Sequence, residues 1–314
     1  MNKKEFNPFD SASLNPWLAL LSLVLITLAG LFLFGGMLGF GVAYLMEGVT
    51  PMDLQPVLND PESYPEYRAM LLAVQGMNSL GGFVLASLIF YYTVIKTPLS
   101  RFFTDRPATL KGLWLAFIVV ISFMIVNTLF AEWNAKMELP EFLFGFEAWA
   151  RGLEERLKIF TDYLINFDSL GYFLFTILAI AIIPAVGEEL LFRGLLQNLF
   201  IKIGRNHHIA IWVSAVLFGA LHFQFFGVVP RILLGALFGY LYWWSGNLLI
   251  PIFAHFLNNG LSLLFLYIYQ IGITDIDVDS MEAFPTSYIV LFFVLGTISI
   301  YYFKKYYQTE YKNE

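Results

Sequence analysis

The stretch SLGYFLFTILAIAIIPAVGEELLFRGLLQNLFI, residues 169–201, decides the fold. Nineteen residues without a formal charge, 169–187, precede Glu188, Glu189 and Arg193, and eight more uncharged residues, 194–201, follow them. A helix needs about 20 apolar residues to cross a bilayer. A charged side chain in the middle of a bilayer costs roughly 2.5 to 3.5 kcal/mol and normally faces the interior of a bundle. These three charges therefore need partners on other helices.

The whole chain shares this apolar character. Of its 314 residues, 58% are hydrophobic and 13% are charged, whereas a soluble domain carries about a quarter charged residues. We predict an all-α polytopic membrane protein with about eight transmembrane helices, whose catalytic core is formed by helices four to seven. The chain has no cysteine, which excludes disulfides, thiolate catalysis and cysteine-ligated metal sites.

Uncharged stretches and breaks place the predicted spans. A Pro-rich acidic segment at 50–68 is predicted as a loop, and the mixed segment 132–168 as an amphipathic helix at the membrane interface. Three regions follow: 1–168 with helices one to three and the interfacial segment, 169–272 as the core, and 273–314 with a last helix and tail. Helix four begins near Ser169, and the other spans are predicted at about 16–46, 69–95, 112–131, 209–223, 229–244, 248–270 and 286–303.

The Lys and Arg residues set the predicted orientation. With the N-terminus inside, eleven fall in cytoplasmic segments and six outside, and this bias predicts that both termini are cytoplasmic. The short connections favour a bacterial inner membrane over an endoplasmic-reticulum membrane. Membrane lipid is the expected surrounding partner, and no nucleic-acid partner is indicated.

The three charges of helix four divide into a pair and a single carboxylate. Glu189 and Arg193 are four residues apart, so they share a helix face and are expected to pair. Glu188 lies about 100° around the helix and needs another partner. The alternative interpretation is structural: a Glu–Arg pair in a membrane helix can serve only to hold helices together.

Other polar residues lie at a similar depth on two further spans. At about 1.5 Å per residue, Glu188 lies roughly 18 Å and His222 roughly 20 Å from the predicted cytoplasmic ends, and His255 and Asn259 roughly 10 to 17 Å. Such a set is typical of a hydrolytic site. Glu188 is the candidate general base, one histidine orients the water or binds a metal that activates it, and the other histidine and Asn259 stabilise the oxyanion.

Three motifs occur in order on three predicted spans: Glu188-Glu189-x-x-x-Arg193, Phe218-x-x-x-His222 and His255-x-x-x-Asn259. Together they resemble the CPBP family, also called Abi-type, of CAAX prenyl-protein endopeptidases and their bacterial relatives, which are often linked to bacteriocin processing or immunity. The resemblance covers about residues 170–270. It implies an intramembrane endopeptidase of eight-helix type that acts on a membrane-associated or lipidated peptide.

The resemblance also implies roles for these residues. Glu188 looks like the catalytic base and His222 its partner in activating water, while His255 and Asn259 look like oxyanion stabilisers. The supporting residues are the ion pair Glu189–Arg193 and Phe218, which belongs to the second motif.

The resemblance leaves open a metalloprotease mechanism and a metal-independent, glutamate-based one. The cofactor is therefore unknown, and a divalent metal such as zinc would be held by Glu188, His222 and His255.

Two other functions compete with peptidase activity. Buried Glu and His residues also form proton relays in transporters, but a transporter predicts internal repeats, and the sequence shows none. A non-catalytic membrane protein for binding or immunity would retain the same motifs. Gly35-x-x-x-Gly39 and Gly235-x-x-x-Gly239 are interpreted as helix-packing signals without chemistry.

Overall fold

The computed structural model describes residues 9, 15–50, 52–96, 107–275 and 282–310. Within these residues the chain is built from helices and contains no strand, and seven helices are long and apolar enough to cross a membrane. The protein is therefore an all-α polytopic membrane protein, as predicted. These helices are Pro16–Glu47, Pro65–Ile95, Leu110–Ala135, Leu170–Gly204, Phe225–Ser245, Leu249–Gln270 and Thr286–Thr309.

The predicted fifth span is shorter than expected. It was predicted at about 209–223, and the structure forms α12, His207–Ala220, with 14 residues. Asn206 starts this helix, because its side chain accepts hydrogen bonds from the backbone N–H groups of His208 and Ile209. Phe223 takes a left-handed conformation with a φ of 55°, which an α-helix of L-residues does not continue through. His222 consequently lies on a turn and not on the helix.

Helix four, Leu170–Gly204, is interrupted by two π-helical turns. Its segments are α9 (Leu170–Thr176), η8 (Ile177–Ile182), α10 (Ile183–Glu189), η9 (Leu190–Gln197) and α11 (Asn198–Gly204). Pro184 follows the first turn and has no N–H to continue the α-helical hydrogen bonds. The two glutamates therefore lie in a short α-helical segment between two π-helical turns, which occur frequently at functional sites.

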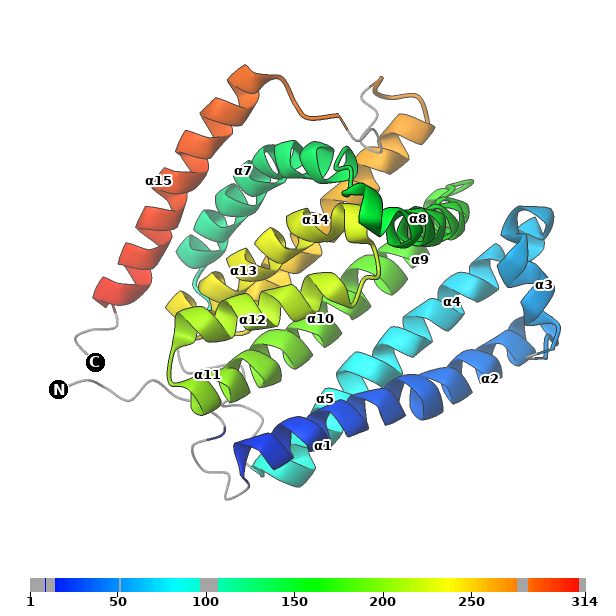
Figure 1. Ribbon diagram of the computed structural model, residues 1–314, viewed down its shortest axis with the longest axis horizontal. Helices are drawn as coiled ribbons and strands as arrows, with labels where there is room; N and C mark the ends of the chain where they lie inside the picture. Colours follow the sequence, from blue (N-terminus) through cyan, green and yellow to red (C-terminus); the bar gives the residue numbers. More distant parts are fainter. Residues whose placement is uncertain (1–8, 10–14, 51, 97–106, 276–281, 311–314) are drawn as a thin grey trace.

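Helix four occupies the middle of the bundle (Figure 1). One side packs on the second span, which contains α4 (Arg68–Ser79), η5 (Leu80–Leu85) and α5 (Ala86–Phe90). The other side packs on α12, α13 (Val228–Ser245) and α14 (Leu249–Gln270). The outer elements are α1 (Pro16–Ala29) and α2 (Gly36–Glu47) at one edge, and α7 (Leu110–Ala135) with α15 (Thr286–Glu310) at the other.

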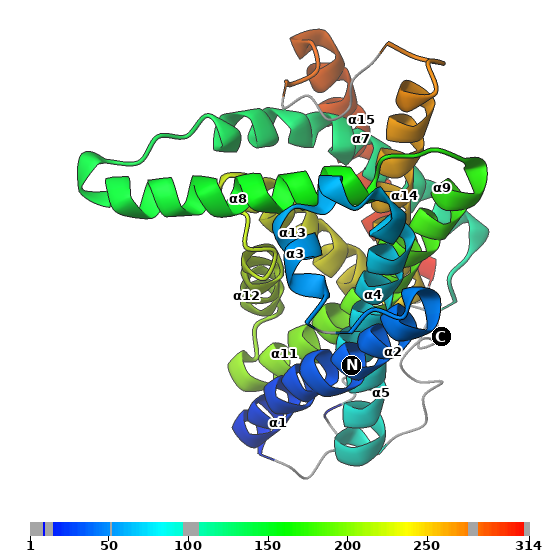
Figure 2. The same cartoon turned by 90° about the vertical axis from the view of Figure 1, so that its right-hand side faces the viewer.

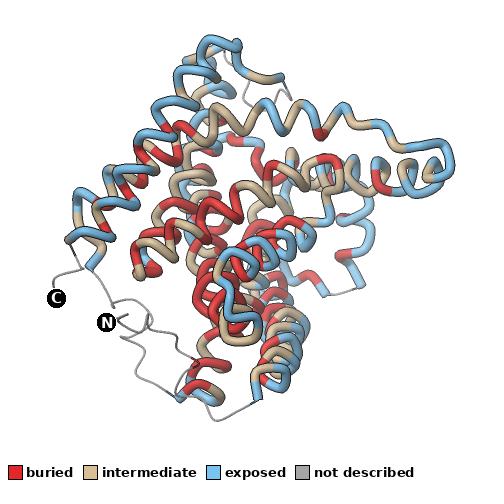
Figure 3. Tube along the Cα trace, turned by 60° about the vertical axis from the view of Figure 1, so that its left-hand side comes forward, coloured by how far each residue is buried: buried red, intermediate tan, exposed pale blue. Residues whose placement is uncertain are grey.

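Burial follows this arrangement (Figure 3). In the most apolar window of each span, 50% of the residues are buried in Phe225–Ser245 and 44% in Leu170–Gly204, but only 17% in Thr286–Thr309. Helix four and its neighbour α13 are thus the spans most packed against protein, while the last span presents most of its surface to lipid.

The interfacial helix predicted within 132–168 is α8, Phe144–Leu164. It runs across the spanning helices (Figure 2) and carries surface ion pairs, such as Lys158 with Asp162 at 2.7 Å. Its Glu154 carboxylate accepts a hydrogen bond from the backbone N–H of Phe226 at 3.1 Å, and Arg151 lies 3.9 Å from the centre of the Phe226 ring. These contacts attach α8 to the connection between α12 and α13, close to His222.

The acidic segment predicted as a loop contains the short helix α3, Leu54–Asn59. Leu54 and Val57, three residues apart, share a helix face and bury their side chains in a core cluster. Burial of this face explains why the segment is helical despite its prolines.

The first two spans cross at glycines, and this crossing gives a stability prediction. A Cβ on Gly81 would lie 2.3 Å from the backbone nitrogen of Gly35, so Gly81→Ala must separate the two helices. We expect a loss of about 1 to 3 kcal/mol in the free energy of unfolding, measured by SDS titration in mixed micelles. Gly41→Ala in α2 is the control, because a Cβ there meets nothing within 4 Å. Equal stability of the two variants would contradict this close approach.

Candidate active site

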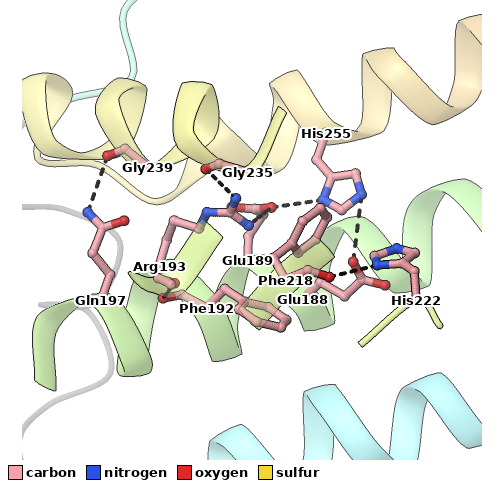
Figure 4. Close-up of polar contacts among 11 residues, drawn as sticks. Glu188, Glu189, Phe192, Arg193, Gln197, Phe218, His222, Gly235, Gly239 and His255 are labelled. Atoms are coloured by element: carbon pink, nitrogen blue, oxygen red, sulfur yellow. Dashed lines mark hydrogen bonds and ion pairs between the residues drawn. The ribbon is translucent and has the colours of Figure 1, made fainter. Parts of the chain in front are cut away.

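A polar stripe on helix four connects it to α13. Glu189, Arg193 and Gln197 follow one another at four-residue spacing and are buried (Figure 4). Arg193 Nη1 donates to Glu189 Oε1 at 2.7 Å, and Arg193 Nη2 donates to the carbonyl of Gly235 at 2.7 Å. One turn further on, Gln197 Nε2 donates to the carbonyl of Gly239 at 3.2 Å. Two turns of helix four thus bond to two turns of α13.

The glycines of α13 make this contact possible. A Cβ on Gly235 would lie 3.1 Å from the Cα of Ala215, and a Cβ on Gly239 would lie 2.8 Å from Gln197 Oε1. Small residues allow α13 to approach α12 closely at Gly235, and at Gly239 the missing Cβ leaves room for the Gln197 side chain of helix four. The predicted packing motif therefore also supplies polar partners for the site.

Aromatic rings enclose the Arg193 guanidinium. Its central carbon lies 4.9 Å from the ring centre of Phe218, 5.4 Å from that of Phe238 and 5.9 Å from that of Phe192. A cation is attracted to the face of an aromatic ring, and this attraction strengthens away from water. The rings, Glu189 and the Gly235 carbonyl together offset the cost of burying this charge.

His255 on α14 joins the two glutamates. Its Nδ1 lies 2.8 Å from Glu189 Oε1, and its Nε2 lies 3.9 Å from Glu188 Oε2. Because the Glu189 carboxylate accepts from Arg193, it also acts as acceptor toward His255, which places a proton on Nδ1. In the neutral ring, Nε2 then presents its lone pair toward Glu188.

Glu188 has the least satisfied carboxylate of the cluster. Its side chain is 15% exposed, and its buried Oε2 has no hydrogen-bond partner within the described part of the chain. When both glutamates are ionised and His255 is neutral, the single positive charge of Arg193 balances only one carboxylate. The cluster then carries one excess negative charge. One proton shared by Glu188 and His255 neutralises it, so these two groups are suited to exchange a proton.

His222 approaches this cluster through Phe218. Its Nδ1 donates to the Phe218 carbonyl at 2.7 Å, since a carbonyl oxygen only accepts, and Nε2 is therefore the free nitrogen of the neutral ring. The Phe218 ring contacts both imidazoles, with its centre 5.0 Å from that of His222 and 5.9 Å from that of His255. Phe218 thus contacts both histidines and the guanidinium of Arg193.

Asn259 contacts helix four at Ile180, away from the two glutamates. Its Nδ2 donates to the carbonyl of Ile180 in a long hydrogen bond of 3.4 Å, and its Oδ1 accepts from Asn258 Nδ2 at 3.1 Å. The Ile180 carbonyl lacks the usual donor four residues later, because that residue is Pro184. In this conformation Asn259 therefore fills a gap left by the proline, two helical turns before Glu188.

The three side chains considered as metal ligands do not form a metal-binding group as they lie here. The described residues contain no group of three or more His, Asp or Glu side chains placed to hold one ion. Glu188 and His255 supply two neighbouring donors, whereas a zinc site with an open position needs three protein ligands. We therefore derive the chemistry from the side chains alone.

The structure brings most of the predicted site residues together. Hydrogen bonds, ion pairs and ring contacts link six residues into one cluster, while Asn259 bonds elsewhere: Glu188, Glu189, Arg193, Phe218, His222 and His255. Sequence reasoning missed Gln197 and the carbonyl groups of Gly235 and Gly239. The signal for Gln197 was present, because it continues the four-residue spacing of Glu189 and Arg193.

Fold and site define a class of protein: a polytopic helical membrane protein with a buried glutamate–histidine–arginine cluster. Comparison with known proteins makes this more specific. Residues 170–261 match the family model of type II CAAX prenyl endopeptidases, Rce1-like. This match supports the resemblance seen in the motifs, and the matched residues include the whole candidate site.

Comparison with curated proteins gives a shorter match. The chain is 34% identical over 85 residues to YpbD, an uncharacterized protein of Bacillus subtilis (strain 168). The aligned part is 26% of this chain and 40% of YpbD, so the chain spans about two fifths of the length of this relative. No solved structure matches the chain.

Proposed function

We propose that this protein is an intramembrane endopeptidase that hydrolyses a peptide bond in a membrane-associated or lipidated peptide. The observation that carries the proposal is the position of Glu188. Its Oε2 is buried without a hydrogen-bond partner among the described residues and lies 3.9 Å from His255 Nε2, inside the stretch that matches CAAX-type endopeptidases. An unsatisfied buried carboxylate beside an imidazole is suited to general-base catalysis.

In the proposed reaction, Glu188 takes a proton from a water molecule and His222 Nε2 accepts that water's second hydrogen bond. The water oxygen bonds to the carbonyl carbon of the substrate and forms a tetrahedral oxyanion. The bond from this carbon to the peptide nitrogen then breaks, and the proton held by Glu188 passes to the leaving amine. Water is the only co-reactant, and the products are a new carboxyl and a new amino terminus.

Oxyanion stabilisation is assigned to His255 and Asn259. His255 donates from Nε2 when this nitrogen carries a proton, and the Glu189 carboxylate behind Nδ1 stabilises the resulting positive charge, as a buried carboxylate does in a catalytic triad. Asn259 Nδ2 has two hydrogens, and its long bond to Ile180 uses one of them. The second hydrogen is the donor we assign to the oxyanion.

The apolar surroundings suggest the substrate and its location. The core spans carry exposed apolar side chains, such as Leu174 and Leu178 on helix four and Leu264 on α14, so a lipid-attached peptide reaches them from within the membrane. We place the protein in a bacterial inner membrane because its connections are short, and both termini in the cytoplasm because of the Lys and Arg distribution. The Bacillus relative supports a bacterial source. The terminal residues 1–8 and 311–314 lie outside the described residues.

Hydrolysis is tested with the purified full-length protein in detergent and a pool of membrane-inserting and lipidated peptides. We expect cleavage in which one oxygen from ¹⁸O-labelled water enters the new carboxyl terminus, detected by mass spectrometry. Release of peptide without the label would contradict water attack. Binding without cleavage across the pool would favour the non-catalytic binding or immunity function.

A second arm of this assay examines whether cleavage requires a metal ion. The arrangement of donors leads us to expect cleavage that survives a strong chelator. Loss of cleavage with the chelator, and its return with added zinc, would instead show that Glu188, His255 and a further donor rearrange around a metal ion.

A further inference from the structure

A cavity separate from the glutamate–histidine cluster lies at the basic end of the bundle. It has a volume of about 450 Å³, within the range of about 300 to 1,000 Å³ that is usual for small-molecule sites. It forms where α11 ends, α12 begins, and α13 and α15 end, all on one side of the molecule in Figure 1. The side chains that matter are Arg205, His207, His208, Trp243, Trp244 and Lys304.

The charged side chains that line this cavity are all basic. Arg205 and Lys304 contribute positive charge to its wall, and the lining contains no carboxylate among the residues that the structure describes. Arg205 follows α11 with a φ of 53°, a left-handed conformation in which a residue other than glycine is uncommon. The resulting turn brings Arg205 and His207, the first residue of α12, to the same cavity.

Aromatic groups form the other wall. The His207 ring stacks on Trp243 with 4.3 Å between ring centres and an angle of 7°, and His208 Nδ1 lies 2.7 Å from the hydroxyl of Tyr240. Lys304 Nζ lies 5.7 Å from the centre of a Trp244 ring. Tryptophan and tyrosine are enriched at membrane–water interfaces, where an apolar body and a polar tip both find partners.

Exposed apolar side chains lie within about one helical turn of the cavity-lining residues on α12 and α15. Ile209 and Trp212 on α12 and Tyr301 on α15 are all exposed. A ligand with a phosphate in the cavity and an apolar tail along these helices would match both surfaces. The cavity alone suits any phosphate anion, while the adjoining apolar surface selects a lipid.

We propose that this cavity, lined by Arg205, Lys304 and the His207–Trp243 stack, binds the phosphate of an anionic phospholipid headgroup. The bound headgroup would connect the end of helix four to α15, which otherwise packs mainly on α7. Arg205 and Lys304 do not belong to the proposed peptidase machinery, so the lipid site is tested without reference to cleavage.

The test is titration of the delipidated full-length protein with lipid, followed by native mass spectrometry. We expect phosphatidylglycerol to bind more tightly than zwitterionic phosphatidylcholine of the same chain length. Arg205→Gln together with Lys304→Gln should weaken phosphatidylglycerol binding about 25-fold, because each basic residue near an anionic headgroup contributes about fivefold. Thermal unfolding of each variant shows that it is folded.

The matched control removes two other charges, Lys111→Gln with Lys305→Gln. Both residues are exposed, and neither is among those that line the cavity. Equal losses in the two double variants, or equal affinity for the two lipids, would overturn the proposal in favour of diffuse surface attraction. Displacement of phosphatidylglycerol by millimolar inorganic phosphate would assign the cavity to free phosphate and overturn the lipid assignment.

Discussion

Replacement of Glu188 by glutamine should abolish cleavage while leaving the protein folded. A general base contributes about 10² to 10⁴ in rate, and the glutamine amide has nearly the same shape but cannot take a proton from water. The loss should appear in kcat, with little change in KM, because Glu188 acts on water and not on the substrate's lipid. Stability should hold, since the change removes a carboxylate oxygen that has no hydrogen-bond partner among the described residues.

The control for this prediction is Glu155→Gln, an identical change on the exposed face of α8. Both variants and the wild type are assayed with the same peptide pool, and circular dichroism and thermal unfolding confirm their folding. Wild-type cleavage by Glu188→Gln would remove Glu188 from the mechanism and leave the buried cluster as a device that holds the helices together.

Replacement of Arg193 by methionine should produce the largest loss of stability. It leaves the Glu189 carboxylate buried with only His255 to compensate its charge, and it removes the donor to the Gly235 carbonyl. Breaking a buried ion pair on one side costs about 3 to 5 kcal/mol. We expect a corresponding fall in the free energy of unfolding in mixed micelles, together with loss of cleavage.

A double variant separates the lone charge from the lost packing. Glu189→Gln with Arg193→Met removes both charges but keeps an oxygen that accepts from His255 Nδ1, so it should be more stable than Arg193→Met alone. Lys158→Met breaks an exposed pair of the same four-residue spacing on α8 and should cost less than about 1 kcal/mol. Equal stability of the Arg193→Met and Lys158→Met variants would contradict the role of the buried pair.

Much of the fold could be predicted from the amino-acid sequence alone, because the membrane restricts the choice of structure. Uncharged stretches located the spans, and Ser169, which accepts a hydrogen bond from the backbone N–H of Tyr172, marked the start of helix four. The length of α12 could not be predicted in this way. Its end depends on the left-handed backbone of Phe223, which nothing in its side chain demands.

The candidate site was predictable where contacts run along a helix and less so where they cross between helices. The four-residue spacing of Glu189 and Arg193 is enough to predict their pairing. The bond from Asn259 to Ile180 depends on which turn of helix four faces α14, and on Pro184, which cannot donate to that carbonyl. Similarly, backbone carbonyls such as that of Gly235 carry no sequence signal of their own as hydrogen-bond acceptors.

The two partners of the Glu189 oxygen also become available at different times during synthesis. Glu189 Oε1 accepts from Arg193, four residues later, and from His255, 66 residues later in the chain. A nascent chain that has inserted helix four holds its carboxylates and arginine, but the imidazole that faces Glu188 has not yet been made. The proposed site is complete only after α14 enters the membrane, so a ribosome-bound intermediate of this protein would be assembled in part and still be harmless to neighbouring peptides.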